Sequence, residues 1–198
     1  ITFGLMYAFT ENFFLSLSHD EVVHLKGSML SKMAGDWWQK FASLRLMFGF
    51  QYTMPGKKLN FMGQEWGEWR EWAETRSLDW HLLQEPDRAG FMEFVARLGH
   101  LYQETRAMWA ADGESRGFEW IDVSDRENCV LSYMRRDGDA HVIVVLNLTP
   151  NPHPDYRIGV PERGEYRVLL SSDDAQWGGS GYASTTEVTP DDIPYHGR

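Results

Sequence analysis

The sequence contains the apolar run Asn12-Phe-Phe-Leu-Ser-Leu-Ser18, and the polar cluster His19-Asp20-Glu21 follows it directly. A short apolar run bounded by polar residues is typical of a buried β-strand. A second run, Lys58-Leu-Asn-Phe-Met-Gly63, leads into Gln64-Glu65-Trp66. The carboxyl ends of parallel strands carry the reactive groups in α/β folds. We therefore expect two parallel strands whose ends carry candidate functional residues.

Two helices are predicted, one between these strands and one after them. Asp36 can cap the first turn of one helix, and apolar residues recur after it at spacings of three and four until Pro55-Gly56. The other helix runs from about Asp87 to Trp109 and has one apolar face. Strand, helix, strand, helix is the repeating unit of a parallel α/β fold. The predicted fold class is therefore α/β up to about residue 110.

After Asp112-Gly113 the pattern changes to short apolar runs separated by turn signals such as Arg136-Asp137-Gly138-Asp139. The predicted strands span residues 118–123, 130–134, 142–148 and 166–170. The closing stretch, Gly178 to Arg198, is rich in Gly, Ser, Thr, Asp and Pro, and we expect a loop there without a final strand. Residues 111–198 are therefore predicted to form an antiparallel, all-β domain.

Charge and cysteine content narrow the classes of function. The 198-residue chain has 29 acidic against 19 basic residues and no basic run, so nucleic acid is not an expected partner. No apolar run reaches the roughly 18 residues that span a bilayer, so no membrane segment is expected. The single cysteine, Cys129, cannot form an internal disulfide. We expect it to be a free, buried thiol in a reducing compartment, which indicates the cytoplasm.

The segment from His19 to His24 also permits a metal-site hypothesis. His19, Asp20, Glu21 and His24 are all possible ligands. In the zincin motif the histidines are four residues apart, about 40° around a helix, whereas His19 and His24 are five apart, about 140° around it. We therefore expect no metal, and an ordinary polar loop with a helix cap remains the alternative to a catalytic site.

Aromatic and charged residues alternate after the second strand. Trp66, Trp69 and Trp72 are interleaved with Glu65, Glu68, Arg70 and Glu71. Rings that pack on sugar faces and polar groups that bind hydroxyls form the mixed lining of a carbohydrate cleft. The same spacing also occurs where a helix edge or turn packs, so that alternative stays open. Four other tryptophans lie within helix or strand patterns and are expected in the core: Trp37, Trp38, Trp109 and Trp120.

Longer motifs along the chain resemble a known family. In the first half they are the runs at residues 7–13, 17–24, 35–36, 38–42, 55–59, 61–63, 70–72 and 77–83, including Leu17-Ser-His-Asp-Glu-Val-Val-His24 and Ser77-Leu-Asp-Trp-His-Leu-Leu83. In the second half they include Gly117-Phe-Glu-Trp120 and Asn147-Leu-Thr-Pro150. Together these runs resemble the C-terminal part of the bacterial α-1,4-glucan branching enzymes of the α-amylase superfamily, in order and over essentially the whole chain.

The resemblance implies a fold and an activity. Residues 1–110 would be the last two β/α units of a (β/α)8 barrel, with strands near Phe13 to Leu17 and Lys58 to Met62, and residues 111–198 an incomplete antiparallel β-sandwich domain. The chain would be truncated at both ends. The family cleaves an α-1,4 bond of an α-glucan such as glycogen with retention, and it transfers the released chain to a 6-hydroxyl. No cofactor is implied.

The resemblance also implies roles for single residues. Asp20 is the carboxylate that stabilises the transition state, and His19 hydrogen-bonds the same sugar. Further substrate-binding residues are expected at the end of the second strand: Glu65, Trp66, Arg70 and Trp72. The nucleophilic Asp and the general-acid Glu of the family lie on earlier strands, so we expect the isolated chain to be inactive.

Three departures from the family pattern flank the expected cleft. Leu25-Lys26 replaces a common Gly-Lys, Trp66 replaces a usual Phe, and Ala73-Glu74-Thr75 replaces a segment that often begins Asn-His. Another glucan hydrolase or transglycosylase of the superfamily, and a non-catalytic glucan-binding module, remain alternatives. The former would share His19-Asp20 but not the long run of motifs to Leu83.

Overall fold

A computed structural model describes residues 5, 7–11, 14–182 and 185–198. Its first part contains strand β1 (Phe14–Leu17), helices α1 (Met29–Lys32) and α2 (Trp37–Thr53), strand β2 (Lys57–Asn60) and helix α3 (Pro86–Glu104). Single 3-10 turns join them: η2 (His19–Glu21), η3 (Gln64–Trp66), η4 (Trp80–Gln84), η5 (Arg106–Met108) and η6 (Ser115–Gly117). The strands are shorter than the predicted ones, and residues 12 and 13 of the first prediction lie outside the described residues.

Strands β1 and β2 are parallel, as predicted, with Phe14 opposite Lys57 and Leu17 opposite Asn60. Helix α2 connects them, and its buried Gln51 donates hydrogen bonds to the carbonyl oxygens of Leu15 and Leu59 at 2.8 and 3.0 Å. One amide thus bridges both strands to the helix that covers them. The β1–α2–β2–α3 order confirms the alternating α/β pattern of the first part.

The two long helices begin and end where local chemistry requires. Asp36 caps α2 by accepting a hydrogen bond from the Gln39 amide, and the Gln39 side chain accepts one from the Asp36 amide in return. Pro55 follows its C-terminal end and disfavours helical backbone before it. Helix α3 begins at Pro86, which lacks an amide proton that a first turn would leave unpaired anyway. It ends at Glu104 rather than Trp109, because the chain tightens there into η5.

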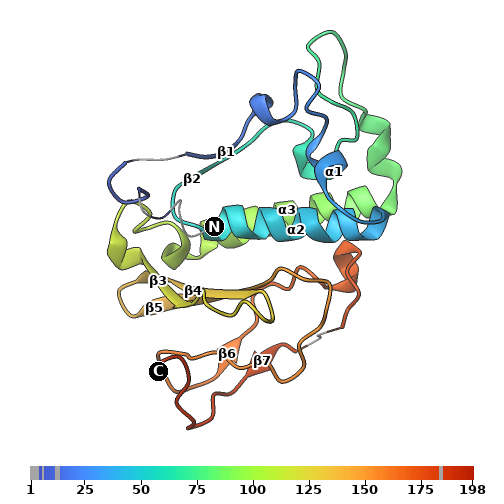
Figure 1. The fold of residues 1–198 in the computed structure, drawn as a ribbon. Helices are drawn as coiled ribbons and strands as arrows, with labels where there is room; N and C mark the ends of the chain where they lie inside the picture. Colours follow the sequence, from blue (N-terminus) through green and yellow to red (C-terminus); the bar gives the residue numbers. More distant parts are fainter. Residues whose placement is uncertain (1–4, 6, 12–13, 183–184) are drawn as a thin grey trace.

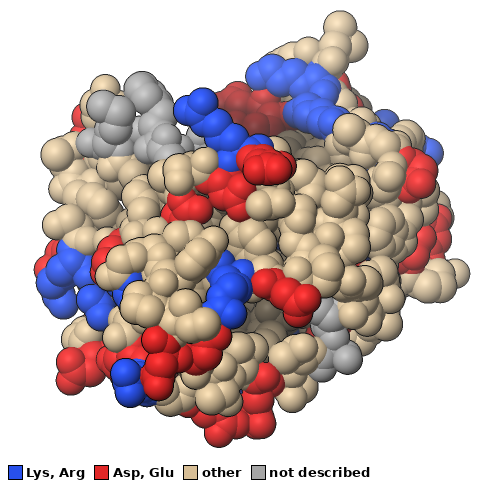
Figure 2. Space-filling view, turned by 60° about the horizontal axis from the view of Figure 1, so that its bottom comes forward, with Lys and Arg blue, Asp and Glu red and all other residues tan. Residues whose placement is uncertain are grey.

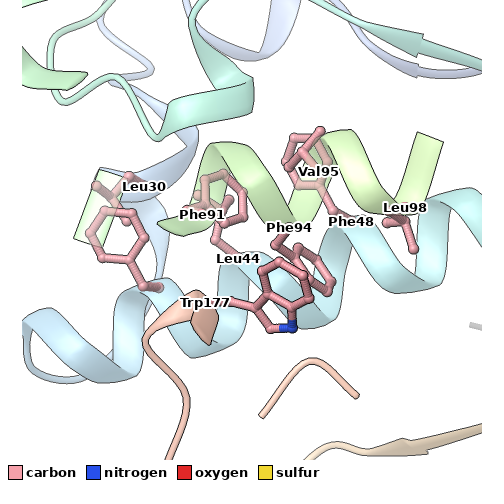
Figure 3. Packing of buried hydrophobic residues seen from close by; sticks show 9 residues of the cluster. Leu30, Leu44, Phe48, Phe91, Phe94, Val95, Leu98 and Trp177 are labelled. Atoms are coloured by element: carbon pink, nitrogen blue, oxygen red, sulfur yellow. The ribbon is translucent and has the colours of Figure 1, made fainter. Parts of the chain in front are cut away.

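The main core lies between α2 and α3 (Figure 3). Phe48 and Phe91 pack edge to face at 5.4 Å. Trp177, from the 3-10 turn η7 (Ala175–Trp177) far along the chain, inserts beside Phe94. Buried Arg45 of α2 holds that turn by donating to the carbonyl oxygens of Ser172 and Trp177. The C-terminal part is therefore anchored on the helices of the first part.

The second part is all-β. Strands β3 (Phe118–Asp122), β4 (Val130–Asp137) and β5 (Ala140–Asn147) form one antiparallel sheet, and β6 (Tyr166–Arg167) pairs with β7 (Glu187–Val188) in another. The two-residue loop Gly138–Asp139 joins β4 and β5 with Gly138 at φ 62°, a conformation glycine adopts freely. Figure 1 shows α2 and α3 between the β1–β2 pair above and these sheets below. The face in Figure 2 carries interspersed acidic and basic side chains.

Several expectations for this part and for the core need correction. The closing stretch does contain a strand, β7, because its extended backbone finds a partner in β6. Cys129 is exposed rather than buried, since it sits in the turn before β4 with φ 52°. Trp37 and Trp38, at the start of α2, are 39% and 45% exposed, whereas Trp109 and Trp120 are half-buried. Among the described helices, none combines the length and apolar character needed to cross a bilayer.

Candidate functional site

His19 and Asp20 lie on η2, directly after the C-terminal end of β1. Ser18 caps this turn: its hydroxyl accepts from the Asp20 amide at 3.1 Å, and its amide and hydroxyl donate to the Glu21 carboxylate at 2.5 and 2.9 Å. The cap stops β1 and turns the next two side chains outward. The His19 and Asp20 side chains are 57% and 71% exposed, with 3.5 Å between Nε2 and Oδ1. Both are therefore open to a ligand.

The loop that follows β2 is ordered by Glu68. Its carboxylate accepts hydrogen bonds from the amides of Trp69, Arg70 and Asp79 at 2.9, 3.3 and 3.1 Å. Arg70 in turn forms an ion pair with Asp79, with Nε 3.1 Å from Oδ2. The Glu68 carboxylate thus connects two parts of this loop and fixes the backbone position of Arg70.

The two loops are tied together beside His19. The Trp72 amide donates a hydrogen bond to the Val22 carbonyl at 3.0 Å. Phe61, just after β2, lies between the rings of His19 and Trp72. Its ring is 5.1 Å from that of Trp72, edge to face, and 6.0 Å from the His19 ring. Arg70 and Trp72 also line a shallow pocket with Val22. The structure therefore brings the rings of His19 and Trp72 close to the same residue, Phe61.

Trp66 does not fit the predicted cleft role. Its side chain is 1% exposed and packs against Trp80 at 4.8 Å between ring centroids. Gly63 and Gly67, both in left-handed conformations, bracket η3 and turn the ring inward. Trp66 is therefore a core residue here, and the packing alternative was correct for this position. Glu65 is half-buried, and its charge acts on the Tyr52 phenol, whose pKa is raised mainly by burial.

Sequence reasoning did not single out Glu71 within its run of alternating residues. Its carboxylate accepts hydrogen bonds from the amides of Leu25 and Gly27, 3.0 and 2.8 Å away, in the loop that follows η2. These bonds, with Gly27 contributing most, lower the pKa of the Glu71 carboxyl. No sequence signal could have found a contact between residues 46 positions apart. Within the described part of the chain, no group of three or more potential ligands could hold a metal ion.

The chain is similar to known proteins over its whole length. A family described as alpha amylase, C-terminal all-beta domain, matches residues 120–198. The whole chain aligns at 52% identity with a 1,4-alpha-glucan branching enzyme of Methylococcus capsulatus and at 51% with one of Cereibacter sphaeroides. Over its full length, the chain is therefore similar to 1,4-alpha-glucan branching enzymes.

Branching enzymes of different bacteria have similar sequence identity to this chain. The branching enzyme of Aquifex aeolicus is 48% identical over the full chain. The chain spans 27% of the length of the Methylococcus and Cereibacter branching enzymes and 32% of the Aquifex one. The predicted division into domains at residues 110 and 111 remains a prediction, although the change from helices to strands falls between η5 and β3.

Proposed function

We propose that this chain is part of a glucan branching enzyme and contributes one carboxylate to its active site. The enzyme breaks an α-1,4-glucosidic bond of an α-glucan with retention and transfers the released chain to a 6-hydroxyl, which creates an α-1,6 branch. The observation that carries the proposal is the exposed His19–Asp20 pair, directly after a parallel strand, in a chain about half identical to branching enzymes.

Asp20 stabilises the transition state. In a retaining reaction the sugar passes through an oxocarbenium-like state, and hydrogen bonds to its hydroxyls that strengthen there supply several kcal/mol. The exposed Asp20 carboxylate and the His19 imidazole beside it suit that role. The nucleophile and general acid, about 5 to 5.5 Å apart in retaining enzymes, come from outside these residues. Arg70 and Trp72 bind neighbouring sugars, and Glu65 is a weaker candidate for the same task.

The fold supports placing these residues in a barrel. We propose that β1–α2–β2–α3 forms the last two units of a (β/α)8 barrel and that residues 111–198 belong to a β-sandwich domain. Active sites of such barrels lie at the C-terminal ends of the strands, which is where His19 lies on β1. A barrel takes about 250 residues, so these units would contribute roughly a quarter of it. We propose that the protein is located in the cytoplasm, and cell fractionation would test this.

A chimeric enzyme tests the function. We would replace the matching segment of the Methylococcus capsulatus branching enzyme by this chain, which aligns with it over 198 residues. The chimera should convert linear α-1,4-glucan into product with α-1,6 branches, measured by debranching and chain-length analysis. Release of short glucans without branches would favour a hydrolase. A folded chimera that binds glucan but leaves it unchanged would favour a non-catalytic binding module.

A further inference from the structure

The loop that follows His19 and Asp20 is held in part by one carboxylate, that of Glu71. Glu71 accepts hydrogen bonds from the Leu25 amide at one oxygen and from the Gly27 amide at the other. The two loops lie together beyond the ends of β1 and β2 (Figure 1), and a backbone hydrogen bond from Trp72 to Val22 lies directly beside the carboxylate. Residues 23–27, which we call the clamp loop, are thus fixed from the β2 side.

The clamp loop has a conformation that its sequence disfavours. His24 and Leu25 have φ angles of 57° and 67°, in the left-handed region that costs energy for residues with a β-carbon. The Leu25 side chain is 99% exposed, so burial of this side chain does not offset the strain. Polar contacts of the backbone must therefore maintain the conformation: the Lys26 amide donates to the Val23 carbonyl across the two residues, and Glu71 accepts from the amides of Leu25 and Gly27.

The clamp loop also touches the candidate catalytic turn. Lys26 donates from Nζ to the carbonyl oxygen of Asp20 at 2.6 Å. The direction in which Lys26 leaves the backbone depends on the left-handed residues before it. A relaxed loop would therefore remove the Lys26 contact from the turn that presents His19 and Asp20.

We propose that Glu71 is a positioning residue of the active site: it holds the clamp loop in its left-handed conformation, so that Lys26 braces Asp20 and Leu25 stands exposed beside the glucan cleft. This role rests on the proposed branching function. Glu71 touches no reacting atom and acts through the loop backbone. Leu25 adds to the need for the clamp, because glycine would adopt the same φ without strain, while His24 remains in the left-handed region.

The test uses the chimeric enzyme and compares Glu71→Gln with Glu74→Gln. Glu74 is exposed in the same loop, and its side chain makes no hydrogen bond or ion pair among the described residues. Both variants remove one charge, but only the first weakens the clamp. Glu71→Gln should lower kcat by about 10- to 100-fold, the effect expected when a catalytic group is slightly misplaced. KM and the thermal midpoint should change little, and Glu74→Gln should match the parent.

A second substitution separates positioning from simple structural damage. Leu25→Gly in the Glu71→Gln background should recover part of the lost kcat, because it removes the strain at one of the two left-handed residues. A general loss of stability would not be rescued this way. Equal kcat for the Glu71 and Glu74 variants, or no recovery in the double variant, would overturn the proposal.

Hydrogen exchange of the loop amides tests whether Glu71 holds the clamp loop without a measurement of enzyme activity. The amides of Leu25 and Gly27 should exchange faster in Glu71→Gln than in the parent or in Glu74→Gln. Faster exchange without loss of kcat would show a clamp that does not position the site and would refute the proposal. If the parent chimera itself makes no branches, the proposed function fails, while the exchange rates still decide whether Glu71 holds the loop.

Discussion

Arg135 of β4 donates a hydrogen bond to the carboxylate of Asp112, with 2.5 Å between Nη2 and Oδ1 and both side chains buried. The same guanidinium donates to the carbonyl oxygens of Gly117 and of Thr53 at the end of α2. Tyr102 of α3 donates to the other oxygen of Asp112 at 3.1 Å. One buried ion pair thus joins both long helices to the C-terminal sheet.

Breaking this ion pair should be costly. Arg135→Met leaves the Asp112 carboxylate buried without its cation, so the free energy of unfolding of the chain should fall by about 3–5 kcal/mol. Arg97→Met is the matched control, because Arg97 forms an exposed pair with Glu104 and its loss should cost less than about 1 kcal/mol. Urea unfolding followed by tryptophan fluorescence measures both. Similar midpoints for the two variants would show that the buried pair does not hold the parts together.

Lys58 should make stability depend on pH in the alkaline range. Its Nζ donates to the Gly56 carbonyl at 2.6 Å, and burial lowers its pKa to about 7. The ordinary lysine pKa is about 10.4, so between pH 7 and that value the unfolded chain binds more protons than the folded chain. Stability therefore rises with pH across this window, and the full cost of burying the charge applies below pH 7.

The measurement is the urea midpoint of the chain at pH 7 and at pH 9, about one unit below the ordinary tyrosine pKa of about 10. The parent should gain stability over this interval relative to Lys58→Met, which has no charge to lose at that position. Lys57→Met removes the exposed neighbouring charge and should keep the gain. If Lys58→Met showed the same rise as the parent, the buried amine would not be its source.

Asp20 should control turnover in the chimeric enzyme. Asp20→Asn keeps the size of the side chain but removes the charge that stabilises an oxocarbenium-like state, so kcat should fall by orders of magnitude. Because the side chain is exposed, the thermal midpoint should stay the same. Asp139→Asn, in the exposed loop between β4 and β5, controls for the loss of one charge. Unchanged turnover in Asp20→Asn would assign the role to another carboxylate.

Cys129 should react in the folded chain. The thiol is exposed in the turn before β4, where its Sγ donates a weak hydrogen bond to the Arg126 carbonyl. A maleimide should therefore label it to completion without denaturant, as followed by intact mass. Labelling that begins only after unfolding would restore the expectation of a buried thiol.

Local sequence predicted the elements whose signals are short-range. Asp36 and Gln39 define the start of α2, Pro55 its end, and the Gly138–Asp139 turn joins β4 to β5, because caps and turns depend on residues within a few positions of one another. The run from Ser18 to Glu21 likewise contains its own cap, so the outward placement of His19 and Asp20 follows from the sequence.

Only the tertiary structure decided what each tryptophan does and what holds the site. Trp66 is buried and Trp37 exposed, although both lie in plausible patterns, because burial depends on which distant segment covers a side chain. Strand β7 forms only because β6 is there to pair with it. Glu71 reaches Leu25 across 46 residues, since parallel strands bring their C-terminal loops together. The sequence by itself thus determined the elements with local caps and turns, including the turn that carries His19 and Asp20, and long-range packing decided the remaining elements and the surroundings of that turn.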